Sequence, residues 1–130
     1  MIYDVDYFIN KFEAIPDDKW CTGQLTSGRV DPITQEESIL HCAFGHCGLK
    51  LEQFASLDTI AQNKEAIALQ KLFTPYDQMN SGNNISLSGV VLVNDGIPTV
   101  RYDYNKLGTD PKSRILVALH LIKNGTASIK

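Results

Sequence analysis

Apolar side chains recur at helical spacing in three parts of the chain. Over residues 5–15 they form one face of an amphipathic helix, which Asp4 can cap and Pro16 can end. The same spacing predicts a second helix over residues 58–73. A last helix is predicted over residues 110–124, where an Asp-Pro pair supplies the cap and the first helical residue.

A fourth helix is predicted between Thr34 and Gly48. Thr34 and Glu37 match a capping box, and the helix that they would open runs to about Cys47, with Gly48 as the terminating residue. Its core-facing stripe follows the i, i+3, i+4, i+7, i+8 spacing of a half-buried helix. The stripe consists of Ile39, Cys42, Ala43, His46 and Cys47.

Two other segments carry strand or turn signals. Residues 20–29 predict a loop or a short hairpin with its tip near Ser27-Gly28. The β-branched run 90–93, followed by Asn94-Asp95-Gly96, favours the first strand of a hairpin that returns through residues 99–104.

The segment before Gly96 has a second interpretation, and one more segment is predicted to be irregular. Ser86 or Ser88 could cap a short helix that ends at Gly96, in place of the strand. The polar residues 77–84 predict an exposed, mobile loop.

These elements predict a mainly α fold of about four helices with a small β-hairpin element, and an α+β fold is the alternative. With 130 residues, the chain is expected to form one globular domain over residues 1–130. The longest aliphatic run, residues 115–119, is too short to cross a membrane, so we expect no membrane association. The start of the chain lacks the features of a secretory signal, which predicts a cytoplasmic protein.

Charge and cysteine content bear on the kind of partner and on the cellular compartment. The formal net charge is -3 and the basic residues are scattered, so a nucleic-acid partner is not expected. Three cysteines cannot all pair within the chain, which fits a reducing compartment.

Four short motifs occur in an order that resembles a known protein family. They are Trp20-Cys21-Thr22-Gly23, then His41-Cys42-Ala43-Phe44-Gly45, then Val93-Asn94-Asp95-Gly96, and last the helix start over residues 111–119. The chain is similar in this respect to a family of small uncharacterised bacterial and bacteriophage proteins, a domain of unknown function with Trp-x-x-Gly, Cys-x-x-Gly and Asn-Asp motifs. The resemblance implies an intracellular bacterial or phage protein and assigns no catalytic residue. This chain has His46 where the family commonly has Ala.

The segment from His41 to Cys47 raises the question of a metal. Cys42 and His46 lie one helical turn apart in the predicted helix, and Cys21, Cys47 or His120 could complete a zinc site. A Cys-x-x-Cys or His-x-x-x-His pair is missing, and free cysteines are commonly buried. We therefore favour a purely structural role, in which this segment is a helix packed in the core, and no cofactor is predicted.

A thiol enzyme is the second chemical alternative. It would combine Cys21, Cys42, His46 and Asp95, with Asp95 or Asn94 orienting the histidine. Cys21, in the loop beside Trp20, is predicted to be the most reactive thiol.

The favoured function is a non-enzymatic one. We expect a protein that binds another macromolecule, such as a host protein, and the thiol- or zinc-dependent enzyme and a structural homo-oligomer are the alternatives. A homodimer could form through the last helix. If one side of the strand that carries Tyr102 and Tyr104 is exposed, these tyrosines form the candidate interaction surface.

Overall fold

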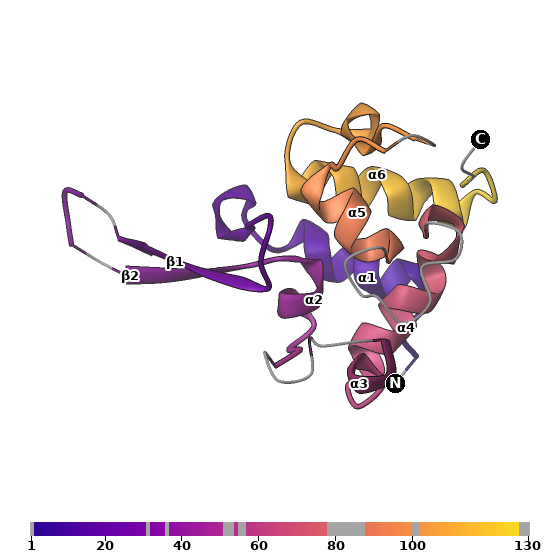
Figure 1. The fold of residues 1–130 in the computed structure, drawn as a ribbon, viewed down its shortest axis with the longest axis horizontal. Helices are drawn as coiled ribbons and strands as arrows, with labels where there is room; N and C mark the ends of the chain where they lie inside the picture. Colours follow the sequence, from indigo (N-terminus) through magenta and orange to yellow (C-terminus); the bar gives the residue numbers. More distant parts are fainter. Residues whose placement is uncertain are drawn as a thin grey trace.

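The computed structural model describes residues 2–30, 32–35, 37–50, 54, 57–77, 88–99 and 102–127. These residues form a mainly α-helical body from which one two-stranded antiparallel hairpin extends (Figure 1). The predicted fold class, mainly α with a small hairpin, is therefore confirmed. No helix of the described residues is both long enough and apolar enough to cross a membrane.

The elements follow one another in a simple order along the chain. They are α1 (Val5–Glu13), η1 (Asp17–Lys19), β1 (Thr26–Val30), β2 (Glu37–His41), α2 (Ala43–His46), α3 (Leu57–Ile60), α4 (Lys64–Leu72), η3 (Thr74–Tyr76), α5 (Gly89–Asp95), η5 (Tyr104–Leu107) and α6 (Pro111–Lys123).

The first and last helices are confirmed, and they pack against each other. The Asp4 side chain accepts a hydrogen bond from the backbone N–H of Tyr7 and so caps α1. Asp110 caps α6 in a capping box with Ser113, directly before the predicted proline. Helix α6 contacts α1 on one side and α5 on another, as the layered helices in Figure 1 show. These three helices therefore supply part of the core, which residues of α2, α3 and α4 also enter.

The segment predicted as one helix over residues 34–47 contains a strand followed by a short helix, so the helical prediction is wrong for residues 37–41. Residues 37–41 form β2, which pairs with β1, and only the last part becomes α2. Gln35 has a φ of 64°, which no helix can contain. Ile39 consequently leaves the predicted buried stripe and is 65% exposed. Gly48, with a φ of 81°, does end α2 as expected.

The structure contains a hairpin, but its strands lie at residues 26–30 and 37–41 instead of within the predicted residues 20–29. Ser27 and Gly28 lie inside β1 instead of at the tip, and the chain reverses between Val30 and Glu37. The reason is a pairing partner that begins only at residue 37, which the local turn signal could not reveal.

The segment before Gly96 is a helix, so the favoured strand prediction is wrong and the alternative is confirmed. Helix α5 follows Ser88 and ends where Gly96 adopts the left-handed conformation, with a φ of 63°. Ser88 occupies the N-cap position, but its side chain makes no capping hydrogen bond, and Ser86 lies outside the described residues. Val90, Leu92 and Val93 are all buried, and a helix that is apolar on most sides is stable when it is enclosed.

The helix predicted over residues 58–73 is divided into α3 and α4. Asn63 starts the second of these because its Oδ1 accepts a hydrogen bond from Ala66 N at 2.9 Å. The loop predicted over residues 77–84 lies, after Asp77, outside the described residues.

Candidate functional site

The side chain of Asn94, near the end of α5, joins three segments of the chain. It is 0% exposed. Its Oδ1 accepts a hydrogen bond from Ala43 N at 3.0 Å, at the start of α2. Its Nδ2 donates to Cys21 O at 3.0 Å and to Asp95 Oδ1 at 2.9 Å. Because a buried amide is costly unless it is paired, the bonds to Ala43 and Cys21 fix the position of α5 against α2 and the loop after Trp20.

A second buried polar residue, Arg114 of α6, holds the end of α5 from the other side. Its Nε donates to Val93 O at 3.0 Å, its Nη2 to Asn94 O at 2.8 Å and its Nη1 to Gly108 O at 3.3 Å. Burial lowers the pKa of Arg114, and Asp110 and Asp95 partly oppose this effect. The guanidinium stays charged, and the carbonyl groups at a helix C-terminus are favourable partners for a cation.

The arrangement around Asn94 leaves a cavity of about 160 Å³ between α2, α5 and the residues before β1. Its lining is mainly apolar, with three polar side chains. The described lining residues are Gly23, Gln24, Cys42, Phe44, Phe54, Val90, Val91, Asn94, Asp95 and Ile97. The cavity therefore brings together two of the predicted chemical residues, Cys42 and Asp95.

Glycine is required where α2 passes the base of the hairpin. A Cβ atom on Gly45 would lie 2.7 Å from Leu25 O and 2.8 Å from the Cβ of His41. Cys42 N donates to Leu25 O at 3.0 Å, which ties the start of α2 to the chain just before β1. The close packing of these segments gives the Cys-x-x-Gly spacing a structural reason.

The chemistry of Cys42 in this cavity is that of a neutral thiol. Burial raises the pKa of Cys42 to about 12, and hydrogen bonds from the backbone of Gly45 and Phe44 offset only part of this rise. A thiol with such a pKa is a poor nucleophile near neutral pH. Cys42 therefore contributes a neutral, weakly polar side chain to the lining of the cavity.

Cys21, which was predicted to be the most reactive thiol, is also buried. It is 8% exposed, and its Sγ donates to Gln24 O at 3.4 Å. Burial, with a smaller effect of Asp95, raises its pKa. Only its backbone carbonyl meets the Asn94 side chain. All three cysteines are free thiols.

His46 lies apart from the cavity and packs among aromatic rings. Its ring centroid is 4.5 Å from that of Trp20 and 5.2 Å from that of His41. Burial, followed by the nearby His41, lowers the pKa of His46 to about 4. Trp20 itself is 5% exposed and contacts Phe12, so it anchors its loop in the core. His46 is neutral at pH 7 and does not converge with Cys42 and Asp95 on the cavity.

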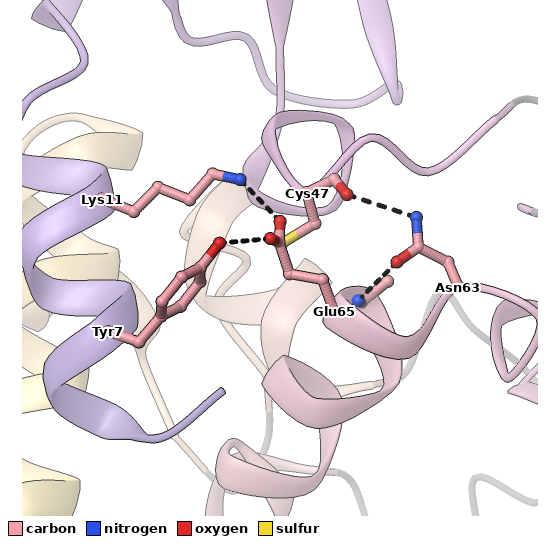
Figure 2. Close-up of polar contacts among 6 residues, drawn as sticks. Tyr7, Lys11, Cys47, Asn63 and Glu65 are labelled. Atoms are coloured by element: carbon pink, nitrogen blue, oxygen red, sulfur yellow. Dashed lines mark hydrogen bonds and ion pairs between the residues drawn. The ribbon is translucent and has the colours of Figure 1, made fainter. Parts of the chain in front are cut away.

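Cys47 belongs to a different cluster, which Figure 2 shows between α1 and α4. Glu65 accepts hydrogen bonds from Tyr7 Oη at 2.5 Å and from Lys11 Nζ at 2.6 Å. The Cys47 side chain lies beside this carboxylate, and Asn63 Nδ2 donates to Cys47 O at 3.2 Å. Burial, with Glu65 next, raises the pKa of Cys47 well above its usual value. This cluster joins the end of α2 to α1 and α4.

The zinc site considered as an alternative and the candidate tyrosine surface are not found in the described residues. In the described parts of the chain, no three His, Cys, Asp or Glu side chains are grouped so that they could hold a metal ion. His120 is on α6, and its Nε2 lies 3.9 Å from Oε1 of Glu13. Tyr104 is 0% exposed and donates to Tyr76 O at 2.7 Å. Tyr102 packs against its ring with centroids 5.0 Å apart, so the condition of an exposed tyrosine pair is not met.

Three features of functional interest were not predicted from the sequence. The first is Arg114, whose position within the apolar stripe of α6, beside Ile115 and Ala118, was a signal that it is buried. The second is Glu65, which carries no such signal. The third is the exposed apolar surface of the hairpin, formed by Val30, Ile33 and Ile39.

No protein-family model, no curated protein and no solved structure matches this chain. The resemblance to small bacterial and phage proteins stays a prediction. The functional argument therefore rests on the geometry of this molecule.

Proposed function

We propose that this protein acts by binding another protein through its β1–β2 hairpin, called the arm below. One observation carries the proposal. The large apolar side chains that are strongly exposed in the described residues are Ile2, Val30, Ile33, Ile39 and Val117, and three of these five lie on the arm or its turn. Scattered exposed apolar residues are normal on a protein surface, but a concentration of them on one projecting element is typical of an interaction site.

The register of the arm places two of these side chains on one face. Ile39 pairs with Gly28, and Val30 is two residues from Gly28 along β1. Side chains two residues apart on a strand share a face, and cross-strand partners share that face as well. Because Gly28 has no side chain to cover Ile39, this face of the arm presents Ile39 at 65% exposure and Val30 at 53%. A protein partner with an apolar surface would bury both.

The backbone of the arm supports the same role. In the described residues the sheet has two strands, and the outer edge of β1 carries no paired strand. Unpaired strand edges readily accept a strand from another chain. The contacts between arm and body are concentrated at the base, where β2 meets η1 and α2 (Figure 1). A projecting two-stranded hairpin is marginally stable in water, so a partner would also stabilise the arm.

The competing thiol enzyme receives less support. Its four candidate residues do not converge, since His46 lies outside the cavity that Cys42 and Asp95 line. The raised pKa of Cys42 and of Cys21 also opposes a thiolate at neutral pH.

The proposal can be tested by cross-linking from the arm. A photoreactive amino acid is placed at Ile39 or, as the matched control, at Val117, which is 40% exposed on α6. Both proteins are expressed and irradiated in bacterial cells, and adducts are identified by mass spectrometry. The expected result is a discrete adduct from position 39 and none from position 117.

The identified partner is then purified and titrated with the wild type and with the Val30→Thr/Ile39→Thr double variant. Threonine keeps the β-branched shape in a strand and removes apolar surface. We expect the double variant to bind at least tenfold more weakly, a loss of about 1.4 kcal/mol. Equal binding by both proteins, or the same adducts from positions 39 and 117, would contradict the proposal. An adduct of twice the protomer mass would favour a homo-oligomer.

A further inference from the structure

We propose that the cavity between α2 and α5 is a binding site for a small organic ammonium compound, with an apolar body about as large as one aromatic ring. The site lies at the base of the arm and does not share the exposed apolar face, so this inference is independent of the protein partner proposed above. It is carried by the size of the cavity, its apolar walls and the carboxylate of Asp95.

The size of the cavity sets the size of the apolar body. The volume is about 160 Å³. An apolar cavity of about 150 Å³ in another protein accepts one benzene molecule, so one ring is the appropriate scale here. The walls include the aromatic ring of Phe44 and the aliphatic side chains of Val90, Val91 and Ile97. Such walls favour an apolar ligand body because its transfer from water removes apolar surface from the solvent.

The carboxylate of Asp95 supplies the charge that selects an ammonium group. Its Oδ1 already accepts the hydrogen bond from Asn94 Nδ2, which orients the carboxylate. Among the described residues, Asp95 forms no ion pair. The nearby cation, Arg114, directs its three donor groups at backbone carbonyls. In the described parts of the chain, Oδ2 of Asp95 accepts no hydrogen bond, so it can take a donor from a ligand, and a cationic donor gives the strongest hydrogen bond.

The other polar groups of the cavity do not favour an anion or a metal ion. Cys42 carries a neutral thiol, for the reason given above, and Asn94 uses its Oδ1 and Nδ2 within the protein. Gln24 has an uncharged amide side chain. The charge that remains in the lining is the single negative charge of Asp95. One carboxylate in an apolar cavity matches an amine with one positive charge.

The probe for the first experiment is benzylamine, and its neutral analogue benzyl alcohol is the comparison. The ¹⁵N-labelled full-length protein is titrated with each compound, and amide chemical shifts are recorded at pH 7. We expect benzylamine to saturate with a dissociation constant on the order of 1 mM, which is reasonable for eight non-hydrogen atoms. The largest shifts are expected at Asp95 and Val91, and benzyl alcohol should bind about tenfold more weakly.

Two variants locate the site. Asp95→Asn removes the charge and keeps an oxygen that can accept from Asn94, so benzylamine should bind about tenfold more weakly, at the level of the alcohol. Val91→Phe adds a ring from the half-buried Val91 into the cavity and should abolish saturable shifts for both compounds. The matched control is Asp18→Asn, which removes an exposed carboxylate on η1 and should leave both titrations unchanged.

The comparison of two ligands on the wild type keeps the test decisive even if a variant fails to fold. Equal binding of benzylamine and benzyl alcohol would overturn the role of Asp95. Saturable shifts that persist in Val91→Phe, or that occur far from α5, would overturn the site itself. Both results leave the proposed role of the arm untouched, because that role is measured with a protein partner.

Discussion

The arm and the α5–α6 pair differ in how their backbone polar groups find hydrogen-bond partners and in which side chains they expose. On the arm, β1 and β2 satisfy each other's backbone groups, and apolar side chains such as Ile39 remain 65% exposed. In the α5–α6 pair, two buried polar side chains, Asn94 and Arg114, satisfy backbone groups that the helices leave open. Their exposed fractions are 0% and 5%.

The two regions therefore differ in what they are expected to contribute to stability. In the body, a few buried polar groups decide how the helices meet, and replacing one of them leaves its partners unpaired in the interior. On the arm, the exposed side chains should contribute little to folding, and under the proposed function they would contact a partner. The site with Cys42 and Asp95 lies where the two regions join, since residues before β1 and residues of α5 both line the cavity.

The largest effect on the body is expected from Arg114→Met. This substitution keeps most of the apolar stem and removes the hydrogen bonds to Val93 O and Asn94 O. We expect a loss of about 3–5 kcal/mol in the free energy of unfolding, because buried carbonyls remain without donors. Urea denaturation followed by far-UV circular dichroism measures it. Lys106→Met, at an exposed position of η5, should change stability by less than about 0.5 kcal/mol, and equal losses in both variants would contradict the structural role of Arg114.

A somewhat smaller effect is expected from Asn94→Ala. The variant leaves Ala43 N and Cys21 O without their buried partner, which should cost about 2–4 kcal/mol. Amide hydrogen exchange at Ala43 should accelerate at the same time. Asn10→Ala, at an exposed position of α1, is the control. If the amide of Ala43 exchanges at the wild-type rate in Asn94→Ala, this hydrogen bond does not hold α2 in place.

The junction between arm and body should make stability depend on pH. The pKa of His46 in the folded protein is about 4, below its ordinary value of 6.5. Between these values the unfolded chain binds more protons at this residue, so the free energy of unfolding falls as the pH falls from about 6.5 to about 4. Because His46 is only partly buried, we expect a loss of about 1–3 kcal/mol over this range.

The measurement is urea denaturation at several pH values for the wild type and for His46→Gln. Glutamine stays neutral, so the variant should lose most of the pH dependence in this range. His120→Gln, at a half-exposed position of α6, should keep it. A wild-type slope that survives in His46→Gln would assign the effect to other groups.

The smallest effect on stability is expected on the arm, and one identical substitution compares the two regions directly. Val30→Thr, at 53% exposure, should change the free energy of unfolding by less than about 0.5 kcal/mol. Val90→Thr, at 1% exposure in α5, should lower it by about 1–3 kcal/mol, because a hydroxyl enters an apolar site. Similar losses at both positions would show that the arm is part of the folded core.

Local sequence signals were sufficient to predict α1 and α6, the first and last helices of the body. The caps and apolar faces of α1 and α6 lie within the helices themselves or at their ends, as with Asp4 and Asp110. The mainly helical class could be predicted for the same reason. These interactions span only a few residues, so the sequence alone carries them.

Only the tertiary structure decided the remaining elements and the site. Residues 37–41 carry a helix-like capping signal, yet they pair with β1, because ladder hydrogen bonds with a partner outweigh a local preference. The segment that becomes α5 allowed a strand as well as a helix, and enclosure by α6 and α2 is compatible with the helix. Cys42 and Asp95 could be named from the sequence as chemical residues. Their shared cavity depends on Asn94, whose hydrogen bonds reach partners 51 and 73 residues away, and contacts at such separations exist only once the chain has folded.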